Sequence, residues 1–331
     1  MICHVFEKEL KDRAVMEKVK LGRTGFEITR LGFGTLPLGR NQANLSVEDG
    51  AKVIRYAINK GINFIDTAAS YGTYGHIREG LKGCEQQVIV ASKTQAKTYE
   101  EAEKDIQNAL EALDRNSLDM FLMHAARSSD PFHERAGCLK CLVDSKRKRL
   151  VKAIGVSTHV VDVVREAAKV SELDVIHPLV NKAGLGIIGG SLEEMLSAAE
   201  EGHRAGKGIY VMKVYAGGHL TDDPVGAFTY LLEKPYLDAF AVGMLKPEEV
   251  EINLSIVEGH SPDYELMRKV GRTTKRLIVL SNLCEGCGNC VKNCPNEALS
   301  LVNGKLTINN STCILCGYCV PVCPQFCIRL V

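Results

Sequence analysis

Short apolar segments alternate with longer amphipathic segments along most of the chain. The apolar runs are LGFGT, NFIDTA (63–68), VIVASKT (88–94), MFLMHAA (120–126), AIGVSTH (153–159), VIHPLVN (175–181), IYVMKVYAG (209–217) and AFAVGM (239–244). Apolar residues occupy successive positions in these runs, as expected for parallel strands buried on both faces. The intervening segment SVEDGAKVIRYAINKG has helical periodicity, with Ser46 as the expected N-cap and Gly61 as the expected C-cap.

This alternation predicts an α/β fold. Eight strands that alternate with helices over roughly 250 residues are typical of a (β/α)8 TIM barrel. A doubly wound sheet is the alternative, but it calls for a G-x-G-x-x-G fingerprint after the first strand, and GFGTLPLG does not match. The preceding segment KVKLGRTGFEITRLGFG is predicted to form a hairpin that turns at Thr24-Gly25 and covers the N-terminal end of the barrel.

Composition and charge narrow the class of protein. The chain has 331 residues, enough for a large domain and a small one, and 45% of them are hydrophobic. The formal net charge of +1 does not favour nucleic acid or an anionic membrane as partner. The N-terminal residues 1–20 contain no uninterrupted apolar run, so neither a signal peptide nor a membrane span is expected there. We therefore expect a soluble, cytoplasmic protein.

Four residues with acid–base chemistry follow consecutive predicted strands. Asp66 and Tyr71 come after the second strand, Lys93 ends the third, and His124 ends the fourth. Since the C-terminal ends of barrel strands meet at one face, these side chains should converge there. A nearby ammonium stabilises a phenolate, and a tyrosine pKa lowered by about 3 units corresponds to about 4 kcal/mol. The set is therefore predicted to donate a proton to a substrate oxygen, although each residue alone has a structural explanation.

The segments GINFIDTAASYGTYG, VIVASKT and MFLMHAA occur in the order typical of the aldo-keto reductase family, which residues 17–270 resemble. The resemblance implies hydride transfer between a nicotinamide cofactor, NAD(P)H, and an aldehyde or ketone. Tyr71 would be the general acid, assisted by Lys93, Asp66 and His124.

The positions that would bind the cofactor match this family less well. The resemblance places ten residues there: Thr35, Ser157, Thr158, His177, Lys213, Gly243, Met244, Lys246, Glu249 and Asn253. Lys213 stands where the family usually has a tyrosine, and His177 where it has a glutamine. Glu249 would repel a 2′-phosphate but accept a hydrogen bond from a 2′-hydroxyl, which favours NADH, whereas Lys246 could supply charge for NADPH.

Nine of the thirteen cysteines lie in the last 48 residues. Cys284, Cys287, Cys290 and Cys294-Pro295 recur as Cys313, Cys316, Cys319 and Cys323-Pro324, always 29 positions later. Two C-x2-C-x2-C-x3-C-P runs are the bacterial ferredoxin pattern for a pair of [4Fe–4S] clusters, in which the fourth cysteine of each run binds the other cluster. Zinc, which is usually bound by two cysteine pairs, fits this spacing less well.

The ferredoxin resemblance covers about residues 275–331 and assigns the ligands. Cys284, Cys287, Cys290 and Cys323 would bind one cluster, and Cys313, Cys316, Cys319 and Cys294 the other. Cys327 is expected to fill a small core, and LSLVNGKLTINN to form a hairpin with an Asn-Gly turn. In the barrel, the isolated pair Cys138 and Cys141 is expected only to pack in a helix.

We therefore predict an N-terminal extension (1–16), a barrel (17–270), a linker (271–283) and a two-cluster domain (284–331). The function expected is reduction of a small carbonyl compound, or oxidation of the corresponding alcohol. This reaction would be coupled or adjacent to one-electron transfer through the clusters to a protein partner. The alternative is an electron-transfer or redox-sensing protein whose barrel docks a nucleotide or partner without carbonyl turnover. A hydride carries two electrons and each cluster takes one, so three arrangements stay open. The barrel binds a flavin, a partner contains one, or the clusters serve the fold or sensing.

Overall fold

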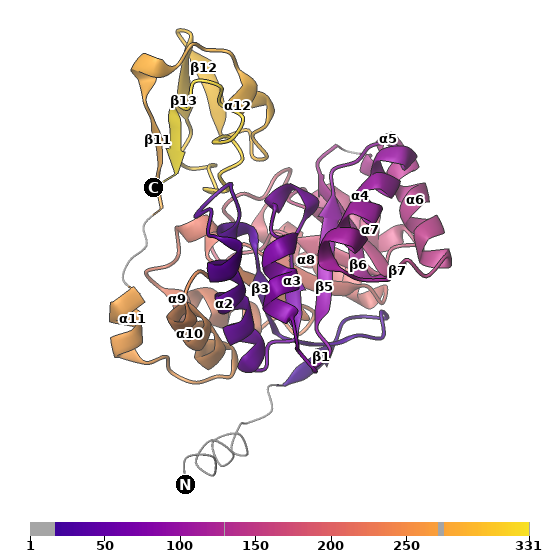
Figure 1. The fold of residues 1–331 in the computed structure, drawn as a ribbon. Coiled ribbons are helices and arrows are strands. Elements are labelled where there is room, and N and C mark those ends of the chain that lie inside the picture. Colours follow the sequence, from indigo (N-terminus) through magenta and orange to yellow (C-terminus); the bar gives the residue numbers. More distant parts are fainter. Residues whose placement is uncertain (1–16, 129, 271–274, 331) are drawn as a thin grey trace.

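The computed structural model describes residues 17–128, 130–270 and 275–330. The predicted N-terminal extension, and Cys3 with it, lies outside these residues, as does part of the predicted linker. Figure 1 shows two bodies, a large one formed by the described residues from 17 to 270 and a small one formed by residues 275–330.

Eight parallel strands close into a barrel in the order β10-β3-β4-β5-β6-β7-β8-β9, which confirms the predicted (β/α)8 fold. The strands are β3 (Leu31–Gly34), β4 (Phe64–Asp66), β5 (Ile89–Thr94), β6 (Leu118–Ala126), β7 (Val151–Thr158), β8 (Val175–Pro178), β9 (Gly208–Met212) and β10 (Ala239–Gly243). Neighbouring strands are in register near their C-terminal ends, where Gly34 pairs with Asp66 and Asp66 with Ala91.

Helices follow each strand and cover the outside of the barrel (Figure 1). They are α2 (Val47–Asn59), α3 (Tyr74–Leu81), α4 (Tyr99–Leu113), α5 (Pro131–Glu134), α6 (Ala136–Arg147), α7 (Val161–Lys169), α8 (Leu192–Arg204), α9 (Pro224–Leu232), α10 (Pro247–Val257) and α11 (Tyr264–Val270). Short 3-10 turns occur at η1 (Leu36–Leu38), η2 (Ala69–Tyr71) and η3 (Ala216–Gly218). Ser46 caps α2 as expected by accepting from the Asp49 N–H, while Lys60 takes the C-cap position and Gly61 follows it with φ 99°. No helix among the described residues is both long enough and apolar enough to cross a bilayer.

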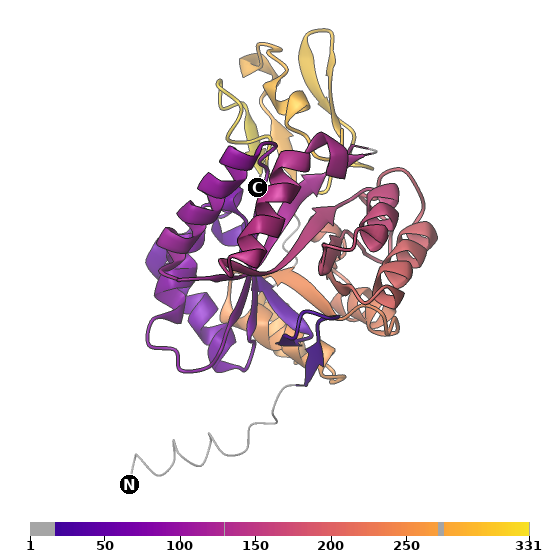
Figure 2. The same ribbon diagram turned by 90° about the vertical axis from the view of Figure 1, so that its right-hand side faces the viewer.

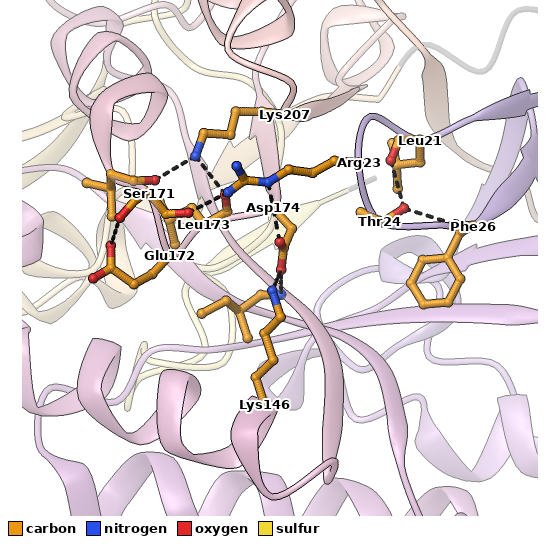
Figure 3. Close-up of polar contacts among 12 residues, drawn as sticks. Leu21, Arg23, Thr24, Phe26, Lys146, Ser171, Glu172, Leu173, Asp174 and Lys207 are labelled. Carbon is orange, nitrogen blue, oxygen red and sulfur yellow. Dashed lines mark hydrogen bonds and ion pairs between the residues drawn. The ribbon is translucent and has the colours of Figure 1, made fainter.

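A hairpin closes the N-terminal end of the barrel, as predicted. Strands β1 (Lys18–Lys20) and β2 (Glu27–Thr29) pair antiparallel, and the hairpin's Leu21, Phe26 and Ile28 pack against residues of the barrel interior such as Phe64. Figure 3 shows how its turn is attached: Arg23 donates to the Leu173 carbonyl over 2.8 Å and lies 3.7 Å from Asp174. The opposite, C-terminal end of the barrel is therefore the end left for a site.

The C-terminal domain is a compact unit around its cysteines. Strand β11 (Leu277–Val279) pairs with β14 (Ile328–Leu330), and β12 (Leu299–Val302) pairs with β13 (Lys305–Ile308) across the predicted turn, where Asn303 and Gly304 both have positive φ. The turn η4 (Ser281–Leu283) and helix α12 (Asn289–Lys292) complete it. Since β11 is part of this sheet, the structure extends the domain back into the segment predicted as a linker.

The C-terminal domain sits on the barrel's C-terminal end, opposite the β1–β2 hairpin, in both views (Figures 1 and 2). Two glycines make the close approach: a Cβ on Gly217 would stand 1.9 Å from the Ile314 carbonyl oxygen, and one on Gly317 would stand 2.2 Å from the Asn41 carbonyl oxygen. The cysteine domain therefore packs directly against the face where barrel chemistry is expected.

Candidate active site and cluster sites

The four predicted acid–base residues lie together at this face. The Lys93 ammonium is 2.8 Å from both carboxylate oxygens of Asp66 and 5.3 Å from the centre of the Tyr71 ring. The Tyr71 and His124 ring centres are 5.7 Å apart, at an angle of 77°. Because their strands are neighbours in the barrel, residues separated by up to 58 positions in the sequence form one group.

Local structure holds these side chains in position. The turn η2 carries Tyr71 back over the end of β4, and Lys93 also donates to the Thr67 carbonyl over 2.8 Å. Arg135, from the segment after β6, donates to the carbonyls of Thr94 and His124, each over 2.9 Å. This guanidinium joins the ends of β5 and β6, and so fixes the backbone that presents Lys93 and His124.

Two further buried residues complete the group. Tyr210 of β9 donates to Asp66 Oδ1 over 3.0 Å and stacks on His177, with ring centres 3.9 Å apart. His177 donates from Nδ1 to the Tyr210 carbonyl over 2.7 Å. Tyr210 was not predicted as a site residue, although its phenol within the apolar run IYVM signals an inward-facing group that needs a buried partner.

Burial dominates the protonation of the site. It raises the pKa of Tyr71 well above the ordinary value, and the neighbouring Tyr318 hydroxyl and the Asp66 carboxylate raise it further. The lowered Tyr71 pKa that the sequence suggested is therefore not found, because a phenolate here would be desolvated and close to a carboxylate. Burial and the Lys93 charge lower the pKa of His124 well below its usual range, so the imidazole is neutral. Tyr71 thus enters any reaction as a protonated hydroxyl.

A cavity of about 240 Å³ opens beside Tyr71. Five of the ten predicted cofactor residues line it: His177, Lys213, Gly243, Glu249 and Asn253. The other five, namely Thr35, Ser157, Thr158, Met244 and Lys246, do not line it. The Thr35 hydroxyl is bound to the Asp66 carbonyl and the Thr73 hydroxyl, Met244 is fully buried, and Lys246 is exposed.

Polar groups that line the cavity are hydrogen-bonded within the protein. Glu249 accepts from the Leu245 N–H over 2.6 Å, and Asn253 accepts from the Tyr215 hydroxyl. Lys275, which was not predicted, also lines the cavity and donates to Gln42 over 2.6 Å. Burial lowers the Lys275 pKa to about 8, with Lys213 lowering it further and Glu249 opposing the shift. The buried His124 Nδ1 has no hydrogen-bond partner among the described residues.

The cysteines of the C-terminal domain form two groups. Cys294, Cys313, Cys316 and Cys319 together line a cavity of about 20 Å³, so the fourth cysteine of the first run lies with the second run. Cys290 lies near Cys287 and Cys323. The backbone N–H of Ala298 donates to Cys294 Sγ over 3.3 Å, and that of Cys327 donates to Cys323 Sγ over 3.4 Å, which repeats the same contact 29 residues later.

These thiols fit two clusters better than single metal ions. All eight are free thiols, and backbone N–H···S contacts are a feature that tunes iron–sulfur centres. In the described ranges, no three His, Cys, Asp or Glu side chains are placed to bind one ion. The four cysteines of a [4Fe–4S] cluster bind different iron atoms and therefore stand apart, unlike zinc ligands. Cys327 is buried in the domain core, and Cys138 and Cys141 are buried in α6, as expected.

The barrel contributes cations and hydrogen bonds to one of the two groups. Arg127, directly after β6, donates to the Cys294 carbonyl over 3.0 Å, and His219 donates to the Cys313 carbonyl over 2.9 Å. Burial lowers the pKa values of Arg127 and Lys213. The nearby thiols of Cys294 and Cys316 oppose the shift of Arg127. The thiols of Cys316 and Cys313 oppose the shift of Lys213. We call Cys294, Cys313, Cys316 and Cys319 the barrel-side group. The other group includes Cys287, which is exposed.

Comparison with known proteins agrees with both bodies. The fold and the two sites define a barrel enzyme of the oxidoreductase type with an appended iron–sulfur domain. Residues 30–226 match the aldo/keto reductase family, and residues 276–324 match the 4Fe-4S dicluster domain. Because the first match covers more than half of the chain, the protein belongs to the aldo/keto reductase family.

Individual relatives are distant. "Probable aldo-keto reductase 1" of Glycine max is 30% identical over 209 residues, which cover 53% of this chain and 59% of that protein. L-galactose dehydrogenase of Arabidopsis thaliana is 25% identical over 292 residues, 76% of this chain and 92% of that protein. The holo form of an aldo-keto reductase from Bacillus halodurans has the same fold, with a TM-score of 0.61 and 20% identity over 77% of this chain and 96% of that one. The chain spans little more than half the length of the first of these relatives.

Proposed function

We propose that the protein reduces a small aldehyde or ketone with NAD(P)H, or oxidises the corresponding alcohol, with Tyr71 as general acid. The placement of the Lys93 ammonium between the Asp66 carboxylate and the Tyr71 ring carries this proposal. A barrel that only docked a partner would have no need for a buried ion pair aimed at a buried phenol, because burying such charges is costly.

Each of the four residues would have a separate role in the reaction. A bound nicotinamide supplies the hydride that the carbonyl carbon accepts. Tyr71 donates its hydroxyl proton to the carbonyl oxygen, and the Lys93 ammonium offsets the negative charge that remains on the tyrosine. Asp66 keeps Lys93 charged and oriented over 2.8 Å. Neutral His124 hydrogen-bonds the carbonyl oxygen and sets its orientation.

The test is the exchange of Tyr71 for Phe in the full, cluster-loaded chain. Loss of a general acid should lower carbonyl turnover by at least about 100-fold, measured as aldehyde-dependent oxidation of NADH or NADPH without oxygen. Tyr99→Phe, at the start of α4, is the matched control and should keep wild-type turnover. Turnover that survives Tyr71→Phe would refute the catalytic assignment.

Cofactor choice rests on the residues around Glu249. A carboxylate in the cavity favours a 2′-hydroxyl, and so NADH, whereas Lys275 offers positive charge for a 2′-phosphate. We propose NADH as the better cofactor. Glu249→Gln should reduce the preference for NADH over NADPH, measured as the ratio of the two dissociation constants, and an unchanged ratio would remove Glu249 from the argument.

The C-terminal domain is proposed to bind two [4Fe–4S] clusters and to pass single electrons to a protein partner. The exposed Cys287 makes its cluster the one that a partner reaches, while the barrel-side group lies near Lys213, which lines the cavity. The contact between the two bodies favours a second candidate function, in which the barrel only senses a nucleotide. Aldehyde turnover distinguishes the two functions, because a barrel that only senses a nucleotide has none. Anaerobic titration with NADH or NADPH tests a separate point: bleaching of the clusters would show electron exchange, which requires a hydride-splitting group such as a flavin, in the barrel or in an added partner.

A further inference from the structure

Lys275 reaches the cavity from outside the barrel. It lies in the segment that leads from α11 to strand β11 of the C-terminal domain, and it lines the cavity together with residues of the loops after β3 and β9. The Lys275 ammonium donates to Gln42 Oε1 over 2.6 Å. Its aliphatic stem lies along Gly218, where a Cβ would stand 3.7 Å from Lys275 Cβ and 3.8 Å from its Cγ and Cδ. The side chain is therefore held between the two loops, with its charge at the cavity.

The charged lining of the cavity has an excess of positive charge. Two lysines line it, Lys213 and Lys275, and two carboxylates, Asp66 and Glu249. Asp66 is already paired with the Lys93 ammonium over 2.8 Å, so its charge is balanced. In the part of the chain that the structure describes, neither lining lysine forms an ion pair with a carboxylate. With one carboxylate against two ammonium groups, the cavity suits an anion.

The place of the Lys275 ammonium relative to Tyr71 indicates which anion this is. Gln42, which accepts from the ammonium, belongs to the same loop as Gly39, and a Cβ on Gly39 would stand only 2.2 Å from the Tyr71 carbonyl oxygen. Tyr71 itself lines the cavity. In a nicotinamide dinucleotide, a single ribose separates the nicotinamide from the diphosphate, whereas a 2′-phosphate lies on the distant adenosine ribose. A nicotinamide beside Tyr71 would therefore bring the diphosphate toward Lys275.

We propose that Lys275 binds the diphosphate of the nicotinamide cofactor. The inference rests on the proposed function for the identity of the ligand, but its test is binding and not turnover. An ammonium that meets a phosphate oxygen forms a charge-assisted hydrogen bond, which is stronger than a bond to a neutral amide such as that of Gln42. Because Lys275 belongs to the segment that leads into the C-terminal domain, this segment supplies part of the cofactor site.

Dissociation constants measured by calorimetry test the proposal in the cluster-loaded full chain, kept anaerobic. The probes are NADH and ADP-ribose, which both carry the diphosphate, and NADPH, which adds a 2′-phosphate. Lys275→Met removes the charge but keeps an unbranched apolar side chain, and Lys275→Arg keeps the charge. Arg276→Met is the matched control, because Arg276 is the next residue, carries the same charge, is exposed and does not line the cavity.

Lys275→Met should weaken the binding of all three probes by a similar factor, at least about tenfold, because the lost contact joins two charged groups. Lys275→Arg should retain part of the affinity, and Arg276→Met should keep the wild-type constants. Raising the ionic strength should weaken ADP-ribose binding more in wild type than in Lys275→Met, since salt screens the attraction.

The outcomes separate this inference from the proposed reaction. Equal affinities of wild type and Lys275→Met for all three probes would overturn the inference, as would equal losses in Lys275→Met and Arg276→Met or the absence of nucleotide binding in wild type. A loss confined to NADPH would place Lys275 at the 2′-phosphate and overturn the diphosphate assignment. Lys275-dependent binding of ADP-ribose, together with no aldehyde turnover in wild type, would refute the proposed reaction while supporting the inference.

Discussion

The Arg127 guanidinium, at the end of barrel strand β6, donates a 3.0 Å hydrogen bond to the carbonyl of Cys294 in the C-terminal domain. A barrel residue therefore contacts Cys294, the cysteine of the first run that lies with the cysteines of the second run. The contact makes the two proposed clusters unequal, because one borders barrel cations and the other has an exposed ligand, Cys287.

Replacing Arg127 with Met should lower the reduction potential of one cluster and leave the other almost unchanged. A nearby positive charge stabilises the reduced, more negative cluster, and each 1 kcal/mol of lost stabilisation is about 40 mV for one electron. An anaerobic redox titration followed by electron paramagnetic resonance measures both potentials. Arg165→Met on α7 is the control for net charge, and equal shifts of both clusters would contradict the assignment.

Tyr210→Phe should cost stability more than catalysis. The change removes the 3.0 Å hydrogen bond to Asp66 but keeps the ring stacked on His177. A hydrogen bond to a charged group contributes about 1.5–3 kcal/mol, so the free energy of unfolding should fall by that amount in denaturant titration. Since Lys93 still contacts Asp66, kcat/KM should fall less than tenfold. Tyr230→Phe on α9 should change neither quantity.

Gly217→Ala should separate the two bodies. The added methyl group would stand 1.9 Å from the Ile314 carbonyl oxygen. This clash adds to the conformational cost of placing alanine at φ 75°. Hydrogen exchange in residues 313–318 should become faster. Gly259→Ala is the matched control, because Gly259 has φ 79° and a methyl group added there would meet no described atom within 4 Å. Equal exchange in the two variants would mean that backbone strain, and not the domain contact, is responsible.

Replacing Asp238 with Asn should remove a loss of folding stability that wild type undergoes as the pH rises from 4 to 6. Burial raises the pKa of Asp238 to about 6, opposed by the Ile209 N–H and by His203 and Arg30. A folded-state pKa above the unfolded value favours the protonated form, so this group's contribution is present below pH 4 and is lost as the pH rises to 6. The loss is on the order of 3 kcal/mol.

The difference in unfolding free energy between wild type and Asp238→Asn should therefore change between pH 4 and 6 and stay constant above pH 7. Asn can still accept from the Ile209 N–H, which isolates the titration from the hydrogen bond. Exposed Asp222→Asn should show no such change, and a flat difference for Asp238→Asn would rule out its titration in this range.

Much of the barrel was predictable because the signals are local. Both-face apolar runs such as VIVASKT mark buried parallel strands, and the polar residues at the ends of such strands must meet, since all the strands point the same way. For this reason the convergence of Asp66, Lys93 and His124 could be predicted from the sequence. Thr35 and Met244 were placed beside the cofactor by resemblance, but both side chains are fully buried and their sequence neighbours line the cavity instead, since the shape of the cavity depends on loops that carry no periodic signal.

The sequence by itself determined the eight-stranded barrel, the hairpin beneath it and the repeated cysteine spacing, because each depends on the order and period of nearby residues. Only the tertiary structure decided that the cysteine domain covers the C-terminal end of the barrel, that Tyr318 lies beside Tyr71, and that burial raises the Tyr71 pKa. These properties depend on desolvation and on contacts between residues almost 250 positions apart, which no local pattern encodes.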